Sequence, residues 1–222
     1  MVYAFIIHTL NLSAGAGMCR VLYSSVFGSD GTPDYFLATT KADMDSEDQT
    51  GSSPASVTLS QQQLNDMRTV SKEQLALVAR QVQSEYSFRK AVHSGDHAEQ
   101  DTSFSGLLDD PSQFEHGMFR LKGGDPFQGE KITVWLGLGS VGLALICEKN
   151  ENRLLAEGAL KLLARYLQEH VQVLTQPAEL LTKGDRVAVI VHQFLPSGRL
   201  LFMNYAVTKQ IERDMDNLLR GK

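Results

Sequence analysis

Several classes of protein are excluded by what this sequence has little of. The chain of 222 residues has only two cysteines, Cys19 and Cys147, and both lie in apolar, strand-like runs. Such thiols are typical of small buried hydrophobes in a reducing compartment, and they argue against a disulfide framework. Basic residues form no block and are outnumbered, with 21 Lys and Arg against 26 Asp and Glu, which argues against a nucleic-acid binder.

Long apolar runs are missing as well. The longest apolar stretch, Ile132–Cys147, is interrupted by glycines and is too short to span a membrane. The first ten residues, MVYAFIIHTL, have neither the basic segment nor the small-residue cleavage site of a signal peptide. The sequence therefore predicts one cytosolic domain with long loops.

The strongest pattern lies in residues 131–174, and it predicts the core. Ile132–Cys147 is rich in apolar and β-branched residues, which indicates two buried strands joined by a turn at Gly139-Ser140. The period then changes to that of a helix that begins near Asn152. Its buried face is expected to hold Leu160, Leu163, Leu167, Val171 and Leu174. Its solvated face is expected to hold Glu157, Lys161, Arg165, Gln168 and Gln172. A sheet with this helix packed across it follows from the pattern.

The same stretch contains a GxGxxG motif at Gly137, Gly139 and Gly142. In dinucleotide-binding folds a helix begins inside the motif, and its N-terminus holds the pyrophosphate. Here Gly142 is followed by Leu-Ala-Leu-Ile-Cys, which is typical of a second strand, and no acidic residue ends a strand about 20 positions further on. The motif therefore favours a glycine-relieved hairpin, with a nucleotide site as the alternative.

The N-terminal part predicts a hairpin, a loop and a helix. Val2–Leu10 reads as an interior strand, and Met18–Phe27 as a second strand after a small-residue turn. Residues 28–63 are rich in Ser, Thr, Gly and acidic residues, which predicts a disordered loop. A helix is expected over residues 71–91, with Ser71 and Gln74 as a capping box. One side of it is apolar: Leu75, Val78, Ala79, Val82 and Tyr86.

Residues 93–117 predict a second acidic loop, because they include no Lys or Arg. The segment contains His93, His97 and His116 near acidic side chains, which raises the question of a metal site. Loose histidine pairs are weak signals, and the Glu of HExxH is absent, so solvated loop histidines are favoured.

The C-terminal part predicts a short strand at Met118–Leu121 and helices at Pro177–Phe194, with a break near Gly184, and at Val207–Leu219. The last helix ends in a DxxxLL sequence, which has the form of an acidic dileucine sorting signal. Its leucines, Leu218 and Leu219, are better explained as packing residues of that helix.

Together these elements predict the α/β (α+β) class: a five-stranded antiparallel or mixed sheet flanked by helices, in one domain spanning residues 1–222. No serine elbow, partnered cysteine or paired carboxylates accompany it, so no catalytic, cofactor-binding or metal residues are assigned. The residues alone indicate a cytosolic interaction domain.

Several strings resemble a known family: MVYAFIIHTL, CRVLYSSVFG, VWLGLGSVGLAL, LLAEGALKLLARYL and FLPSGRLLFMN. Together they resemble the sigma (small) subunits of the fifth adaptor protein complex, and the element order resembles the longin-like fold of adaptor sigma and N-terminal medium subunits. The resemblance covers nearly all of the chain outside the two acidic loops.

The resemblance implies a non-enzymatic small subunit of a heterotetrameric adaptor complex, which sorts cargo at late endosomes and lysosomes. The implied partners are large subunits of zeta and beta type, a medium subunit of mu type and, through the complex, spatacsin and spastizin. Membrane association would be peripheral, and the residues of the partner interface stay unknown. A dileucine cargo pocket is not expected, because the acidic residues 93–117 would repel acidic cargo. The alternatives are a longin-type module of another trafficking complex or a nucleotide-binding enzyme that uses residues 137–142.

Overall fold

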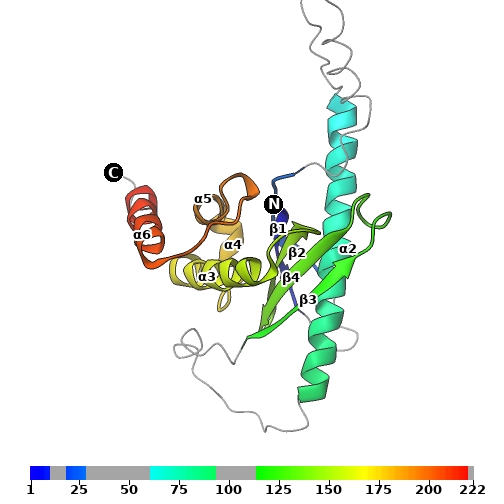
Figure 1. Cartoon of the computed structure of the whole chain (residues 1–222), viewed down its shortest axis with the longest axis horizontal. Coiled ribbons are helices and arrows are strands. Elements are labelled where there is room, and N and C mark those ends of the chain that lie inside the picture. Colours follow the sequence, from blue (N-terminus) through cyan, green and yellow to red (C-terminus); the bar gives the residue numbers. More distant parts are fainter. Residues whose placement is uncertain (11–18, 29–60, 94–113, 220–222) are drawn as a thin grey trace, which may run out of the picture.

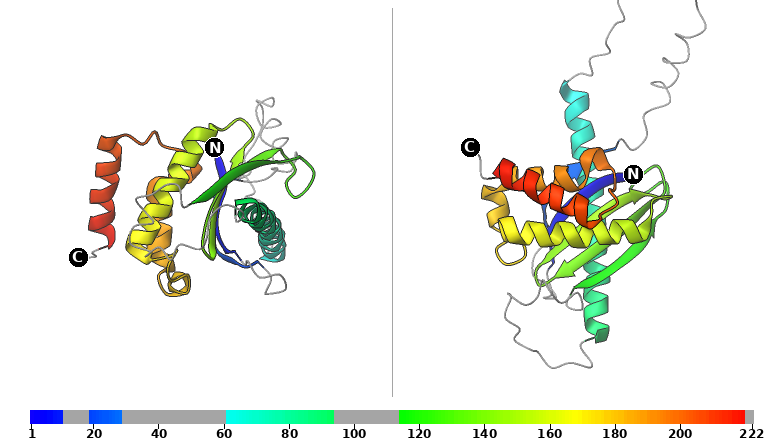
Figure 2. Two further views of the ribbon diagram at one scale, coloured as in Figure 1. Left: turned by 90° about the horizontal axis from the view of Figure 1, so that it is seen from below. Right: turned by 60° about the vertical axis from the view of Figure 1, so that its left-hand side comes forward.

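A computed structural model of the chain describes residues 1–10, 19–28, 61–93 and 114–219. These residues form a five-stranded sheet in the order β2-β1-β5-β4-β3, with helices on both faces, as the sequence predicts (Figures 1 and 2). All four strand pairings are antiparallel. The strands are β1 (Val2–Thr9), β2 (Val21–Val26), β3 (Glu115–Leu121), β4 (Lys131–Leu138) and β5 (Val141–Glu148).

The centre of the sheet is the predicted hairpin of β4 and β5. Leu138 pairs with Val141, so Gly139 and Ser140 form a two-residue turn, and Gly139 has a φ of 57° that glycine adopts without strain. Strand β1 pairs with β5 on one side and with β2 on the other, which confirms the prediction of an interior strand. The expected turn at residues 11–17 lies outside the described residues.

One helix, α2 (Gln61–His93), covers one face of the sheet (Figure 2). It begins ten residues before the predicted start, so the predicted capping box of Ser71 and Gln74 is wrong. The side-chain amide of Gln74 instead donates a hydrogen bond of 2.7 Å to the carbonyl of Pro126. The first turns lack apolar periodicity, but they are rich in Gln, Leu and Met, which favour helix. The predicted loop 28–63 is thus helical in its last three residues, and residues 29–60 lie outside the described part.

The opposite face carries the remaining helices: α3 (Arg153–Val171), α4 (Glu179–Thr182), α5 (Gly184–Phe194), the 3₁₀ turn η2 (Pro196–Gly198) and α6 (Tyr205–Leu219). The predicted start of α3 is confirmed, because the side-chain oxygen of Asn152 accepts a hydrogen bond of 3.1 Å from the Leu155 N–H. The predicted break near Gly184 is also confirmed, since α4 and α5 are separate helices.

Two residues of the α3 region differ from the prediction. Helix α3 ends at Val171 because Gln172 adopts a left-handed conformation, so Leu174 is buried in the turn that follows the helix. Gln168 was expected in solvent, but it is buried. Its side-chain carbonyl accepts a hydrogen bond of 2.8 Å from the Leu174 N–H, and its amide donates one of 3.2 Å to Thr175. The amide side chain therefore closes the turn after α3.

Strand β3 begins at Glu115, three residues before the predicted start. Exposed residues (His116, Met118 and Arg120) alternate there with less exposed ones, as expected of an edge strand. The predicted loop 93–117 is therefore wrong at both ends. Its last three residues, 115–117, belong to β3, and its first residue, His93, is the last residue of α2. Residues 94–113 lie outside the described part of the chain.

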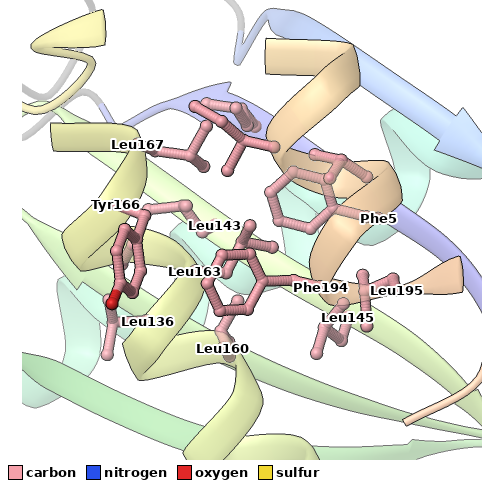
Figure 3. Packing of buried hydrophobic residues seen from close by; sticks show 14 of the residues in the cluster. Phe5, Leu136, Leu143, Leu145, Leu160, Leu163, Tyr166, Leu167, Phe194 and Leu195 are labelled. Atoms are coloured by element: carbon pink, nitrogen blue, oxygen red, sulfur yellow. The ribbon is translucent and has the colours of Figure 1, made fainter. Parts of the chain in front are cut away.

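The sheet separates two apolar cores. The larger lies between the sheet and helices α3 and α5, where Leu163, Phe194 and Leu143 meet (Figure 3). The smaller lies under α2, where Val82, Tyr86 and Trp135 meet. The layer order is therefore one helix, the sheet, and then a layer of several helices.

Candidate partner-binding surface

The GxGxxG motif serves packing within the hairpin. A Cβ atom on Gly137 would lie 2.6 Å from the Tyr86 ring, and one on Gly142 would lie 2.6 Å from the His8 ring. Gly139 supplies the turn with its positive φ. Both strands around the motif are antiparallel and no helix begins within it, so it has no helix N-terminus to hold a phosphate. The hairpin interpretation is confirmed, and each glycine has a structural reason.

The two thiols are not arranged as nucleophiles. Cys147 is buried, and burial raises its pKa to about 12. Cys19 is half-buried, with its Sγ atom 3.5 Å from His8 Nδ1, and burial raises its pKa too. The neighbouring His8 does not offset this, because burial lowers the pKa of its imidazole to about 4. A neutral, weakly basic imidazole beside a protonated thiol is the reverse of an activated pair.

The histidines of the second acidic segment form no described metal site. His116 Nε2 lies 3.4 Å from Glu157 Oε1, and His97 lies outside the described residues. No cluster of three or more His, Cys, Asp or Glu able to hold a metal occurs in the part of the chain that the structure describes. Among its helices none has the length and apolarity needed to cross a membrane.

The most regular feature of the surface is an apolar line along the outside of α2. Four side chains there are between 43% and 68% exposed: Val70, Leu77, Phe88 and Val92. Their spacings of 7, 11 and 4 residues are close to whole turns of a helix, so they lie on one face. We call these four residues the outer stripe of α2. Leu75, Val78, Val82 and Tyr86 face the sheet, and the centre of their face lies roughly 125° around the helix axis from the outer stripe.

Helix α2 is longer than the sheet requires. Its 33 residues span about 50 Å, whereas the buried residues among its described side chains lie between Leu75 and Tyr86. The helix consequently extends beyond the sheet at both ends, as Figure 1 shows. Among the described elements α2 packs against strands alone, so no described helix covers its outer side.

Exposed apolar residues on the opposite side of the molecule are scattered. They are distributed over α3, α4, the segment before α6 and α6 itself: Leu154, Leu181, Phe202, Tyr205 and Leu218. Leu218 was expected to be a packing residue of α6, but it is 55% exposed, so that expectation is wrong. The side chain of Leu219 lies outside the described residues. No single helix face connects these positions, in contrast to the outer stripe of α2.

Sequence reasoning did not find the outer stripe. The predicted helix of residues 71–91 ends short of Val70 and Val92, and the periodicity that predicts it is that of the residues facing the core. The signal was nevertheless present, because Leu77 and Phe88 fall on the side of the helix that its apolar face leaves to solvent. A second apolar line on a helix that already has one is typical of an interaction surface.

Comparisons with known proteins point to one family. A family model described as AP-5 complex subunit sigma-1 matches residues 1–216. The Homo sapiens protein named AP-5 complex subunit sigma-1 is 35% identical over 216 residues, which cover 96% of this chain and 96% of the relative. The Mus musculus protein of the same name is 38% identical over 178 residues, which cover 79% of this chain and 91% of the relative. The family-model match thus includes the sheet and the helices on both of its faces.

Proposed function

Since the chain belongs to the AP-5 complex subunit sigma-1 family, we propose that it acts as the small subunit of an adaptor complex and binds a large subunit through the outer stripe of α2. Family membership supports the adaptor role in vesicle trafficking. The choice of surface is supported by the regular apolar face of α2, which the fold itself leaves without a covering element among the described residues.

The geometry of the outer stripe fits a helical partner. The four side chains, spaced by 7, 11 and 4 residues, form a line along the helix axis, and lines of side chains of this kind pack into the grooves of another helix. Phe88 is the best anchor of the four, because aromatic side chains dominate the energetics of most interfaces. We propose that the large subunit is a helical solenoid, which would present such grooves repeatedly along its length.

The finer identity of the partners follows from the resemblance. We propose large subunits of zeta and beta type and a medium subunit of mu type, with spatacsin and spastizin reached through the complex. The proposed location is the cytosolic side of late endosomes and lysosomes, with the membrane bound peripherally through partners. The proposed role is non-enzymatic, which is supported by the raised pKa values of both thiols and by the structural use of the GxGxxG glycines.

The proposal is tested with charge substitutions on the outer stripe. The variant Leu77→Asp/Phe88→Asp is tagged, recovered from cells in mild detergent, and its bound proteins are identified and quantified by mass. We expect the large subunits to be lost, since truncation of an interface hot spot costs 2 kcal/mol or more, which is about a 30-fold loss of affinity. The matched control is Leu154→Asp/Leu181→Asp, which adds the same charge at exposed leucines on α3 and α4.

Both variants should unfold at the wild-type temperature, because all four side chains are exposed. Loss of the large subunits from the control but not from the stripe variant would place the interface on the other side of the molecule. A wild-type chain that is recovered alone, folded and with bound nucleotide would contradict the adaptor role and favour a function of Gly137–Gly142.

A further inference from the structure

A pocket of about 450 Å³ lies at one end of the sheet, and four of its eight lining residues are cations. Its walls come from three segments that topology brings together: the end of β3, the start of β4 and the turn after β5. The charged residues among its lining are Arg120, Lys122, Glu130, Lys131 and Lys149. Four cations and one carboxylate around one hollow are notable in a chain whose net charge is −5.

Only part of this positive charge is neutralised. The Lys131 ammonium lies 3.1 Å from Glu148 Oε1, and Lys149 lies 3.9 Å from Glu130 Oε2. Arg120 and Lys122 have no ion pair with any described residue, so the pocket retains an excess of two positive charges. An excess of cations in a hollow concentrates the electrostatic field there and attracts multiply charged anions.

One of the cations is held rigidly. The Lys131 side chain is 5% exposed, both Glu148 oxygens accept hydrogen bonds from it, and its ammonium lies 5.2 Å from the centre of the Tyr3 ring. Arg120 belongs to β3 and Lys131 to β4, so two of the cations stand on strands of the sheet. A site on rigid elements loses less conformational entropy on binding than one on loops.

We propose that this pocket binds a phosphorylated inositol ring, as a phosphoinositide headgroup at a membrane surface. A phosphate group carries about two negative charges at pH 7, which matches the excess of cations, and arginine and lysine are the usual phosphate ligands. The volume lies in the range of roughly 300–1,000 Å³ that small-ligand sites occupy. A phosphopeptide fits less well, because the apolar residues Leu121 and Ile132 of the lining are buried and offer no anchor for neighbouring side chains.

The proposal does not depend on the large-subunit interface, since the two surfaces share no residue. It would give the chain a direct contact with the membrane, in addition to any that partners provide. Membrane-surface contacts of this kind depend on ionic strength, because exposed charges are screened by salt.

Binding is measured with the full-length chain and two probes. The first is a fluorescent soluble inositol bisphosphate, followed by anisotropy. The second is a phosphatidylcholine vesicle that contains a phosphatidylinositol bisphosphate, compared by co-sedimentation with a vesicle whose equal charge comes from phosphatidylserine. The test variant is Arg120→Glu/Lys122→Glu, and the control is Arg186→Glu/Arg213→Glu, which changes the net charge equally at exposed positions of α5 and α6. Unchanged thermal unfolding shows that each variant is folded.

We expect the chain to bind both the soluble ring and the phosphoinositide vesicle, in preference to phosphatidylserine. The test variant should bind at least about tenfold more weakly, since it removes two charge-assisted contacts, whereas the control should bind as the wild type does. Binding of the soluble ring but not of the vesicle would keep the phosphate site and assign it to a soluble inositol phosphate. Absence of binding, an equal loss in the control, or tighter binding of a phosphoserine peptide would overturn the proposal.

Discussion

The two faces of the sheet are packed by different means. On one face α3 touches both the sheet and α5, and the core between them is built of aliphatic and aromatic residues. On the other face α2 is the only described helix, and its contacts are with strands. Buried side chains of the α3 face are thus enclosed from two sides, whereas those of the α2 face meet a single helix whose outer side is open.

The polar residues of the interior are concentrated on the α2 face. Three buried polar atoms have no hydrogen-bond partner among the described residues: His8 Nε2, Thr133 Oγ1 and Trp135 Nε1. Trp135 contacts the α2 core, and Thr133 points the same way because it is two residues along the same strand. The glycines that cannot accept a Cβ, Gly137 and Gly142, also face this side, against Tyr86 and His8.

The two faces of the sheet contribute differently to the molecule. The α3 face supplies most of the apolar burial that drives folding, because it carries the larger core. On the α2 face the Tyr86 ring packs closely against the backbone of Gly137, and we expect this contact to add little to apolar burial but to restrict where the helix lies. A fixed position matters for α2 because its outer stripe is the surface that we propose to meet a partner.

The largest expected effect concerns the enclosure of the two cores. Leu163 on α3 and Leu75 on α2 are both buried, so Leu→Ala at each removes the same atoms. We expect Leu163→Ala to lower the free energy of unfolding by about 4 kcal/mol and Leu75→Ala by about 2–3 kcal/mol, because a helix packed on one side can relax into the cavity. Chemical denaturation of both variants measures the difference.

The larger loss of unfolding free energy is expected for Leu163→Ala, and this order tests whether the two faces differ in enclosure. If Leu75→Ala cost as much as Leu163→Ala or more, α2 would be as firmly enclosed as α3, and the distinction between the faces would fail. Leu154→Ala on α3 serves as the control, since its side chain is exposed and its loss should change stability by less than about 0.5 kcal/mol.

The difference between the two faces is also a difference in how well the sequence predicts their buried residues and helix bounds. The buried apolar residues of β4, β5 and α3 agree with the prediction, because burial alone accounts for their alternating and helical periods. The start of α2 was missed because its first turns carry no apolar period, and Gln168 was misplaced because a polar residue can be buried when a turn satisfies it. The cation-lined pocket was also beyond prediction, since Arg120, Lys131 and Lys149 are brought together only by strand pairing.

A second prediction uses the buried imidazole of the α2 face. Burial lowers the pKa of His8 from 6.5 to about 4, while its Nδ1–H donates a hydrogen bond of 3.1 Å to the Thr9 carbonyl. Between these pH values the unfolded chain binds more protons than the folded one, so stability falls as the pH falls from 6.5 towards 4. Above pH 6.5 this contribution is constant. The loss attributable to His8 is about 3 kcal/mol over the whole interval.

The variant His8→Met removes the contribution of His8 to the pH dependence of stability, because methionine has a similar volume and does not titrate. In denaturation curves between pH 7.5 and 4, the stability of the wild type relative to the variant should fall by about 3 kcal/mol as the pH falls, since only the wild type loses the His8 contribution. Carboxylates titrate in both proteins and cancel in the difference. Curves that stay parallel over the whole interval would show that His8 does not control the acid sensitivity of the α2 face.

The smallest expected effect is that of replacing a glycine by alanine. The change in the free energy of unfolding should have opposite signs at Gly158 and at Gly137. Gly158 lies in the exposed part of α3, where an added Cβ would meet nothing within 4 Å. Gly158→Ala should therefore raise the free energy of unfolding by about 0.5–1 kcal/mol, because glycine inside a helix loses more backbone entropy than alanine. Gly137→Ala should lower it, since the new Cβ would lie 2.6 Å from the Tyr86 ring and displace α2 from the sheet.

Because both substitutions add the same methyl group, a stabilising Gly137→Ala would mean that α2 moves freely over the sheet. In that case the contacts between glycine and aromatic rings would not fix the helix, and the outer stripe would be presented by a mobile element.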